Sequence, residues 1–200
     1  MDVDILETVE QAQQESDRSK HRLNAAVAVS VALLATFMAI CKVKDDNIVQ
    51  GMQQAQADKL DYWGYYQARN IRQEVLETSV VQLQTQRAMA PPAQQPALDA
   101  LITKQQAAAA EQDRKKNELK TQAEGAQKQY DALNFHDDQF DLSDALLAIA
   151  IAMLAVTALT GLWWMYWLAL VPSVFGVIMG VAGLIGSSSI HPDALIKLLS

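Results

Sequence analysis

The sequence predicts an all-α membrane protein: three transmembrane helices, with a long antiparallel, coiled-coil-like helical hairpin between the first and second. Residues 145–192 contain no Asp, Glu, Lys or Arg. A membrane-spanning helix takes ~20 apolar residues, so this segment has about the right length for two. A second uncharged segment, 23–41, supplies the third span. Between the apolar segments lies a region rich in Ala, Gln and charge that is interrupted by clustered prolines.

The N-terminal part is expected to be a polar helix over residues 1–22, followed by the first span over 23–43. Ile5, Val9 and Ala12 recur at helical spacing in this first segment. The chain starts with acidic residues, whereas a cleavable signal peptide starts with basic ones. The first span is therefore expected to be retained.

The C-terminal apolar segment is expected to hold a second span at 144–162 and a third at 168–186. An aromatic turn at 163–167 is predicted between them, because Trp and Tyr favour the headgroup level of a bilayer. The tail, 187–200, is expected to lie in the membrane interface, with Pro192 in the first turn of a short helix.

Small residues recur along all three spans, and five of them are candidate helix-packing positions. They are Ala28 and Ala32 in the first span and Gly176, Gly180 and Gly183 in the third. In lipid, helices associate where small residues let their backbones approach closely. These positions either hold one protomer together or join protomers.

The region 44–143 is expected to fold back on itself at a turn over 91–96. Proline ends helices, and Pro91, Pro92 and Pro96 divide the region into arms of equal length, 45–90 and 97–142. Steps of three and four predict an inner seam on each arm. The first series is Ile48, Met52, Ala55, Lys59, Tyr62, Tyr66, Arg69, Gln73, Leu76, Val80 and Leu83; the second is Leu98, Leu101, Gln105, Ala108, Gln112, Lys115, Leu119, Gln122, Ala126, Gln129 and Leu133. Five of the eleven residues in the second series are polar, which leaves too little apolar contact for a self-sufficient coiled coil, so a homo-oligomer is expected.

Four aromatic residues lie together on the first arm: Tyr62, Trp63, Tyr65 and Tyr66. Because four aromatics within five residues cannot share one face of a helix, some must be exposed or contact another chain. They are a candidate protomer contact. The alternative is packing against the return arm near Leu119, Ala123 and Ala126.

An acidic cluster precedes the second span. It comprises Asp137, Asp138, Asp141 and Asp144, with His136 beside them. Asp141 and Asp144 have roughly the spacing of a capping box, and acids favour a helix N-terminus. The alternatives are an acidic vestibule at the mouth of an oligomeric pore and a divalent-cation site. Asp45 and Asp46 follow the first span and are expected to lie close to the cluster.

Several classes of function are disfavoured by composition and by absent motifs. A net charge of −7 argues against nucleic acid as a partner. The apolar segments 23–41 and 145–186 contain no Asp, Glu, Lys, Arg or His, which argues against proton-coupled transport. The single Cys41 has no neighbouring base and is expected to be a packing residue. Without a phosphate-binding loop, paired Cys/His ligands or a hydrolase elbow, we expect no enzyme activity, cofactor or catalytic residue.

Residues 40–73 carry the segments KVKDDNIVQ and YYQARNIRQ. This stretch resembles a family of uncharacterised bacterial membrane proteins that carry a domain of unknown function. The resemblance implies one span before this helical region and a double span near the C-terminus. It implies no activity and no site residues.

The orientation follows from basic residues beside the spans. Arg18, Lys20 and Arg22 stand on the N-terminal side, against Lys42, Lys44 and Lys197 on the other. The positive-inside rule counts mainly short loops, so Lys42 and Lys44, which begin a long one, are left out. The rule then predicts a cytoplasmic N-terminus and a periplasmic hairpin. When Lys42 and Lys44 are counted, each side has three basic residues and the rule gives no preference.

Together these expectations describe a multi-pass protein of the bacterial inner membrane, in contact with lipid, with copies of itself and with other envelope proteins. The functional hypothesis is a non-enzymatic oligomeric scaffold or docking assembly. The alternatives are an oligomeric cation channel with an acidic vestibule, and an accessory subunit of a larger membrane complex.

Overall fold

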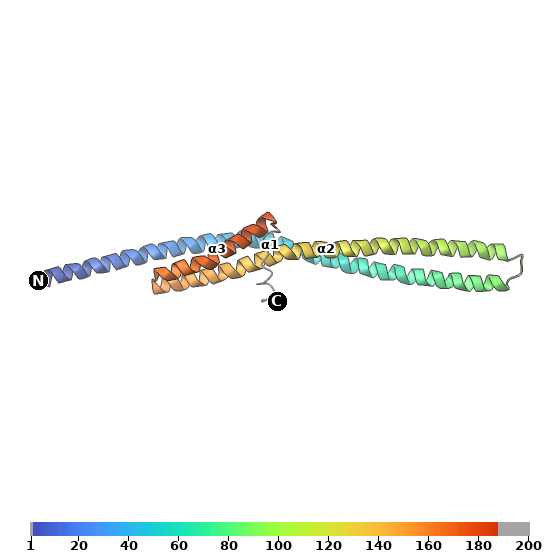
Figure 1. Ribbon diagram of the computed structural model, residues 1–200, viewed down its shortest axis with the longest axis horizontal. Helices are drawn as coiled ribbons and strands as arrows, with labels where there is room; N and C mark the ends of the chain where they lie inside the picture. Colours follow the sequence, from blue (N-terminus) through green and yellow to red (C-terminus); the bar gives the residue numbers. More distant parts are fainter. Residues whose placement is uncertain (1, 188–200) are drawn as a thin grey trace. The chain divides into compact units, whose positions relative to one another are not determined.

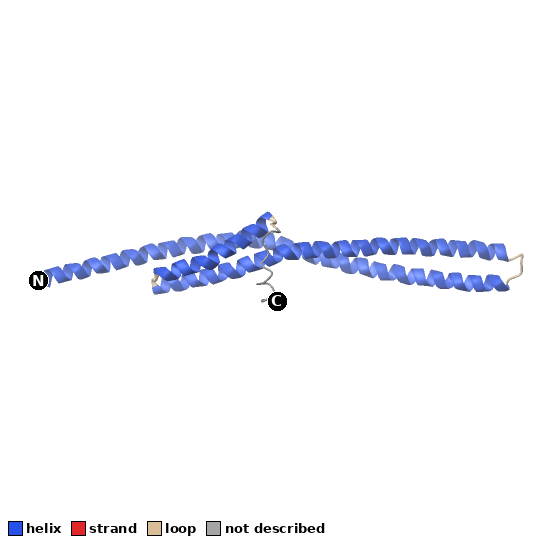
Figure 2. Ribbon diagram, in the orientation of Figure 1, coloured by secondary structure: helices blue, strands red, loops and turns tan. Residues whose placement is uncertain are grey.

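The computed structural model describes residues 2–187, in which every regular element is a helix (Figure 2). The three helices are α1 (Asp2–Met89), α2 (Gln95–Thr160) and α3 (Trp163–Ile185) (Figure 1). Each carries a segment long and apolar enough to cross a membrane. The chain divides into two compact units, one made by Met1–Val49 with Leu133–Ser200 and the other by Gln50–Ala132. Of the predicted tail, 187–200, all residues after Ser187 lie outside the described residues.

The boundaries predicted at 22/23, 43/44 and 143/144 are not breaks in the secondary structure. α1 continues through the first two, and α2 continues through the third. No proline interrupts either stretch, and a lone glycine such as Gly51 or Gly125 costs a helix only about 1 kcal/mol relative to alanine. A change from polar to apolar composition therefore changes the surroundings of a helix without ending it.

The turn predicted at 91–96 lies where the prolines placed it. α1 ends at Met89 and α2 begins at Gln95, so Pro96 occupies the first turn of α2, where its missing N–H costs nothing. The Gln94 amide donates to the Pro91 carbonyl at 2.9 Å.

The second turn differs from the predicted aromatic turn at 163–167. The chain leaves the helix only at Gly161 and Leu162, and Trp163 already begins α3. Gly161 has a φ of +70°, a conformation that residues with a Cβ rarely adopt. The tryptophans thus form the first turns of a helix: Trp164 and Trp167 are exposed, and the Trp163 indole donates to Ser19 Oγ at 3.1 Å.

The first unit is built from α3 and the parts of α1 and α2 that belong to it. Its core is a cluster of buried apolar residues from all three helices: Leu23, Val27, Leu34, Leu147, Ala150, Leu154 and Ala169. Two hydroxyls add a polar contact between α1 and α3, since Ser30 Oγ and Tyr166 Oη lie 3.0 Å apart.

The second unit consists of one segment of α1 beside one segment of α2 (Figure 1). Hydrogen bonds join Lys59 to Gln127 and Arg69 to Gln112, and an ion pair joins Arg87 to Asp99. Early positions of one segment therefore meet late positions of the other. Every residue of the seam predicted for the first arm is buried or half-buried.

The seam predicted for the second arm is partly wrong. Leu101 is 47% exposed, whereas Ile102 is 8% exposed. The observed seam takes a step of four where the predicted series took three, and it runs through Leu98, Ile102, Gln105, Ala109, Gln112, Lys116, Leu119, Ala123, Ala126, Tyr130 and Leu133. The corrected seam replaces Gln122 and Gln129 with Ala123 and Tyr130 and is more apolar than expected.

Candidate functional site

The acidic residues gather around one buried carboxylate of α1. Asp45 is 4% exposed, and its Oδ2 accepts a bond of 2.7 Å from Lys42 Nζ. Its Oδ1 is buried and has no hydrogen-bond donor. The charge of Asp45 acts on Asp137 and Asp141 of α2, and the Asp137 carboxyl also interacts with the Asp45 carboxyl through a side-chain hydrogen bond. Asp45 thus lies among the acids of α2, while Asp46 pairs with Lys42 at 3.5 Å.

The electrostatics of this site favour bound protons. Burial raises the pKa of Asp137 to about 6, with the charge of Asp141 and the contact with Asp45 as further causes. Burial, followed by the charge of Asp45, also raises the pKa of Asp141. Both effects arise because removing a carboxylate from water, or placing it beside another negative charge, disfavours its ionised form.

Next to the acids, a polar layer joins α2 to the end of α3. Gln139 is fully buried, and its amide donates to the Ser187 carbonyl at 2.9 Å. On the other side, His136 Nδ1 lies 3.1 Å from Gln139 Oε1. Ser143 Oγ donates to the Gly176 carbonyl at 2.8 Å. These contacts hold the acidic segment of α2 against α3.

The capping interpretation of Asp141 and Asp144 is wrong. Both residues lie in the middle of α2, which is continuous from Gln95 to Thr160, so no helix begins there. Local spacing resembled a capping box, but helix-forming residues continue on both sides. Within residues 2–187, no group of three or more His, Cys, Asp or Glu side chains is arranged to hold a metal ion, so the divalent-cation alternative has no support.

The glycines predicted to pack helices do so inside the protomer. A Cβ at Gly176 would stand 2.8 Å from Leu147 Cγ, and a Cβ at Gly183 would stand 2.8 Å from Phe140 Cζ. Gly180 is closer still, because a Cβ there would meet the Phe37 ring at 2.7 Å. α3 thus approaches its neighbours at distances that only glycine permits.

The alanines predicted to pack helices lie elsewhere. Ala28 and Ala32 are exposed, and α1 packs instead through Leu23, Val27 and Leu34. Large apolar residues therefore form the contact inside the unit, and the alanine face is left uncovered. A contact of this face with another protomer stays a prediction.

The four aromatics of α1 divide between two environments. Trp63 and Tyr66 pack edge to face with their ring centroids 5.2 Å apart, and Lys116 Nζ lies 5.9 Å from the centroid of the Tyr66 ring. Tyr62 is also half-buried, whereas Tyr65 is 61% exposed. Tyr62, Trp63 and Tyr66 are half-buried, so Tyr65 is the member of the group best placed for an outside contact.

Sequence reasoning missed the central place of Asp45, although a signal for it existed. Buried positions of α1 follow a regular spacing through Leu34, Cys41, Ile48 and Met52, and Asp45 falls in phase with them. A carboxylate in an otherwise apolar helix face is unusual, because an ionised group is costly to bury. Extending the spacing of the buried seam residues from Ile48 back toward the first span would have identified Asp45 as a buried residue.

Comparison with known proteins gives a family and no function. No curated protein and no solved structure matches the chain. The family model described as "Domain of unknown function (DUF4337)" matches residues 23–186, a range that covers all three apolar segments and both arms. The chain therefore belongs to the DUF4337 family, whose members share a domain of unknown function.

Proposed function

We propose that this protein is a non-enzymatic scaffold of the bacterial inner membrane, which assembles into homo-oligomers and offers a docking surface to other envelope proteins. In this proposal the three apolar segments cross the bilayer, and the arms form an antiparallel hairpin in the periplasm. The proposal rests on one observation: the helix pair of the second unit leaves large apolar side chains uncovered on one side of α1.

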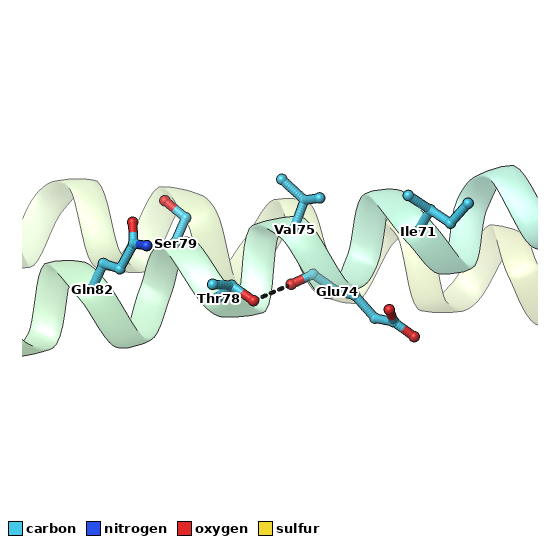
Figure 3. A pocket seen from close by; sticks show the side chains of 6 residues that line it. All are labelled: Ile71, Glu74, Val75, Thr78, Ser79 and Gln82. Carbon is cyan, nitrogen blue, oxygen red and sulfur yellow. Dashed lines mark hydrogen bonds between the residues drawn. The ribbon is translucent and has the colours of Figure 1, made fainter.

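The uncovered side chains are Leu60, Ile71, Val75 and Met89, each more than 60% exposed. They recur at helical spacing on the side of α1 away from the seam residues Gln73, Leu76 and Val80. We define these four residues as the outer stripe. A shallow groove over its centre is lined by Ile71, Glu74, Val75, Thr78, Ser79 and Gln82 (Figure 3). In Figure 3 the side chains of Ile71 and Val75 point the same way from the helix.

The charge balance of the second unit favours a second copy of the chain as the partner that covers the outer stripe. Residues 50–132 carry ten Lys and Arg (Lys59, Arg69, Arg72, Arg87, Lys104, Arg114, Lys115, Lys116, Lys120 and Lys128). The same residues carry ten Asp and Glu (Asp58, Asp61, Glu74, Glu77, Asp99, Glu111, Asp113, Glu118, Glu124 and Asp131). Two copies of this unit therefore meet without net repulsion. The seam within one copy contains Lys59, Arg69 and Gln73, so additional apolar burial between copies would supply stability that the seam lacks.

Light scattering after size-exclusion chromatography of the detergent-solubilised protein tests the proposal. We expect a protein mass that is a multiple of 22.0 kDa. The double variant Ile71→Glu, Val75→Glu should shift this mass toward one copy, because burying two carboxylates between copies is costly. The matched control Gln84→Glu, Ala88→Glu places the same charges, at the same spacing, on another side of the helix and should keep the mass. A wild-type protein of a single copy would contradict the scaffold. A different protein that co-purifies in stoichiometric amount would support the accessory-subunit alternative instead.

A further inference from the structure

Among the described residues of the first unit, the Oδ1 atom of Asp45 is buried and has no hydrogen-bond donor. A buried acceptor without a donor costs about 1–3 kcal/mol, and more when it carries charge. Lys42 reaches only the other oxygen of this carboxylate. The Asp137 carboxyl of α2 interacts with the Asp45 carboxyl, and Asp137 has a proton to donate only when it is a carboxylic acid.

We propose that Asp45 and Asp137 form a proton-binding pair, in which a proton held by Asp137 is donated to the buried Oδ1 of Asp45. Two facing carboxyls that share one proton avoid the repulsion of two anions and satisfy the buried acceptor at the same time. Uptake of the proton thereby stabilises the contact between α1 and α2. Loss of the proton leaves two negative charges that repel each other. The pair is a pH-sensitive contact between these helices.

The surrounding groups determine the pH at which the pair responds. On α1 they are Cys41, Lys42 and Asp46; on α2 they are His136, Asp138, Asp141 and Asp144. α3 carries no Asp, Glu, Lys, Arg or His. Lys42 is engaged by Asp45 and Asp46, which leaves the negative charges of α2 as the main neighbours of Asp137. With the pKa of Asp137 raised to about 6, the proton is bound near pH 5 and released above pH 7.

Infrared difference spectroscopy on the full chain in lipid nanodiscs tests this directly. We expect a protonated carboxyl C=O band at pH 5 that disappears by pH 7.5, with a midpoint near pH 6. Asp137→Asn should remove this band. The matched control Asp46→Asn changes an exposed neighbouring carboxylate and should keep the band and its midpoint. A band that is absent from the wild type, or that keeps its full intensity and midpoint in Asp137→Asn, would overturn the proposal.

Thermal unfolding gives a second readout. A folded-state pKa that is raised stabilises the fold below the ordinary value of a carboxyl, and this stabilisation is lost as the pH rises through about 6. The melting temperature of the wild type should fall across this window. Asp137→Asn should reduce the fall to the part contributed by Asp141, because its amide is a permanent donor to Asp45 Oδ1. If the wild type instead shows no fall, or if its midpoint follows the sodium concentration at constant ionic strength, the pair does not hold a proton.

Discussion

The hydroxyl of Ser143 on α2 donates a hydrogen bond of 2.8 Å to the backbone carbonyl of Gly176 on α3, at a buried position. The contact depends on a second glycine, because a Cβ at Gly180 would lie 2.8 Å from the same Ser143 oxygen. The glycines of α3 thus permit both close packing and an interhelical hydrogen bond, two interactions that stabilise helix pairs in lipid.

Gly180→Ala should destabilise the first unit. The added methyl would overlap the Phe37 ring and Ser143 Oγ, and overpacking of this kind costs about 1–3 kcal/mol. The measurement is thermal unfolding in detergent, followed by circular dichroism. Gly125→Ala is the control: a Cβ at Gly125 meets nothing within 4 Å, so this change should stabilise the helix by up to about 1 kcal/mol. Equal effects of the two substitutions would show that α3 does not pack as described.

Gly161→Ala should strain the turn between α2 and α3. With a φ of +70° at this residue, a side chain costs about 1–2 kcal/mol in the left-handed region. Gly161→Asn should cost less, because asparagine tolerates this region better than alanine does. The expected order of melting temperatures is Gly, then Asn, then Ala. An alanine variant as stable as the wild type would mean that the turn adopts another backbone conformation.

Leu101 and Ile102 are neighbours of similar size, but only Ile102 lies in the seam of the helix pair. Ile102→Ala should cost about 2 kcal/mol or more, since Ile102 is 8% exposed and its removal leaves a gap against α1. Leu101→Ala is the control and should stay within ~0.5 kcal/mol, because Leu101 is 47% exposed. Urea unfolding of the full chain, followed by circular dichroism, measures both. If the leucine variant is the weaker one, the seam originally predicted from the sequence is the true one.

These two residues also show what the sequence could and could not predict. On α1, the apolar residues Ile48, Leu76 and Val80 leave one phase for the seam, and the prediction was right. On α2, Leu98 is followed by apolar residues three and four positions later, so local spacing allows either phase. Only the contact with α1 selects Ile102.

The elements were predicted better than their ends. Long apolar and polar stretches predicted three candidate spans and two arms, and the prolines placed the turn between Met89 and Gln95. The tryptophans and the acidic spacing predicted helix ends wrongly. Tryptophan indicates the depth of a residue in the membrane and acidic residues indicate contact with solvent, and neither requires the backbone to leave the helix. The expectation that Asp45 lies close to the acidic cluster is confirmed by its effect on Asp137 and Asp141, whereas the burial of Asp45 was missed, although the spacing of the seam residues indicated it.

Glu111 should support the second unit only above strongly acidic pH. Hydrogen bonds from Arg114 and then Lys115 lower the pKa of Glu111 from 4.5 to about 2. A lowered pKa stabilises the fold above the ordinary value, and the stabilisation is lost as the pH falls through about 2. Glu111→Gln should therefore lower the melting temperature slightly at pH 7 and leave it unchanged at pH 2. Glu124→Gln, whose Lys120 partner stands 3.9 Å away, should have the smaller effect at pH 7. A loss of equal size at both pH values would contradict the role of the ion pair.

Residues on either side of the first apolar segment should lie on opposite faces of the membrane. Gln13 and Gln94 are both exposed, and one predicted span, 23–43, separates them along the chain. In a Cys41→Ser background, Gln13→Cys and Gln94→Cys each supply a single thiol for labelling in sealed vesicles. A membrane-impermeant reagent should label one variant and spare the other, while detergent should expose both. If the reagent labels both in intact vesicles, the apolar part of α1 does not cross the bilayer, and the exposed alanines Ala28 and Ala32 would then face water or another protein instead of lipid.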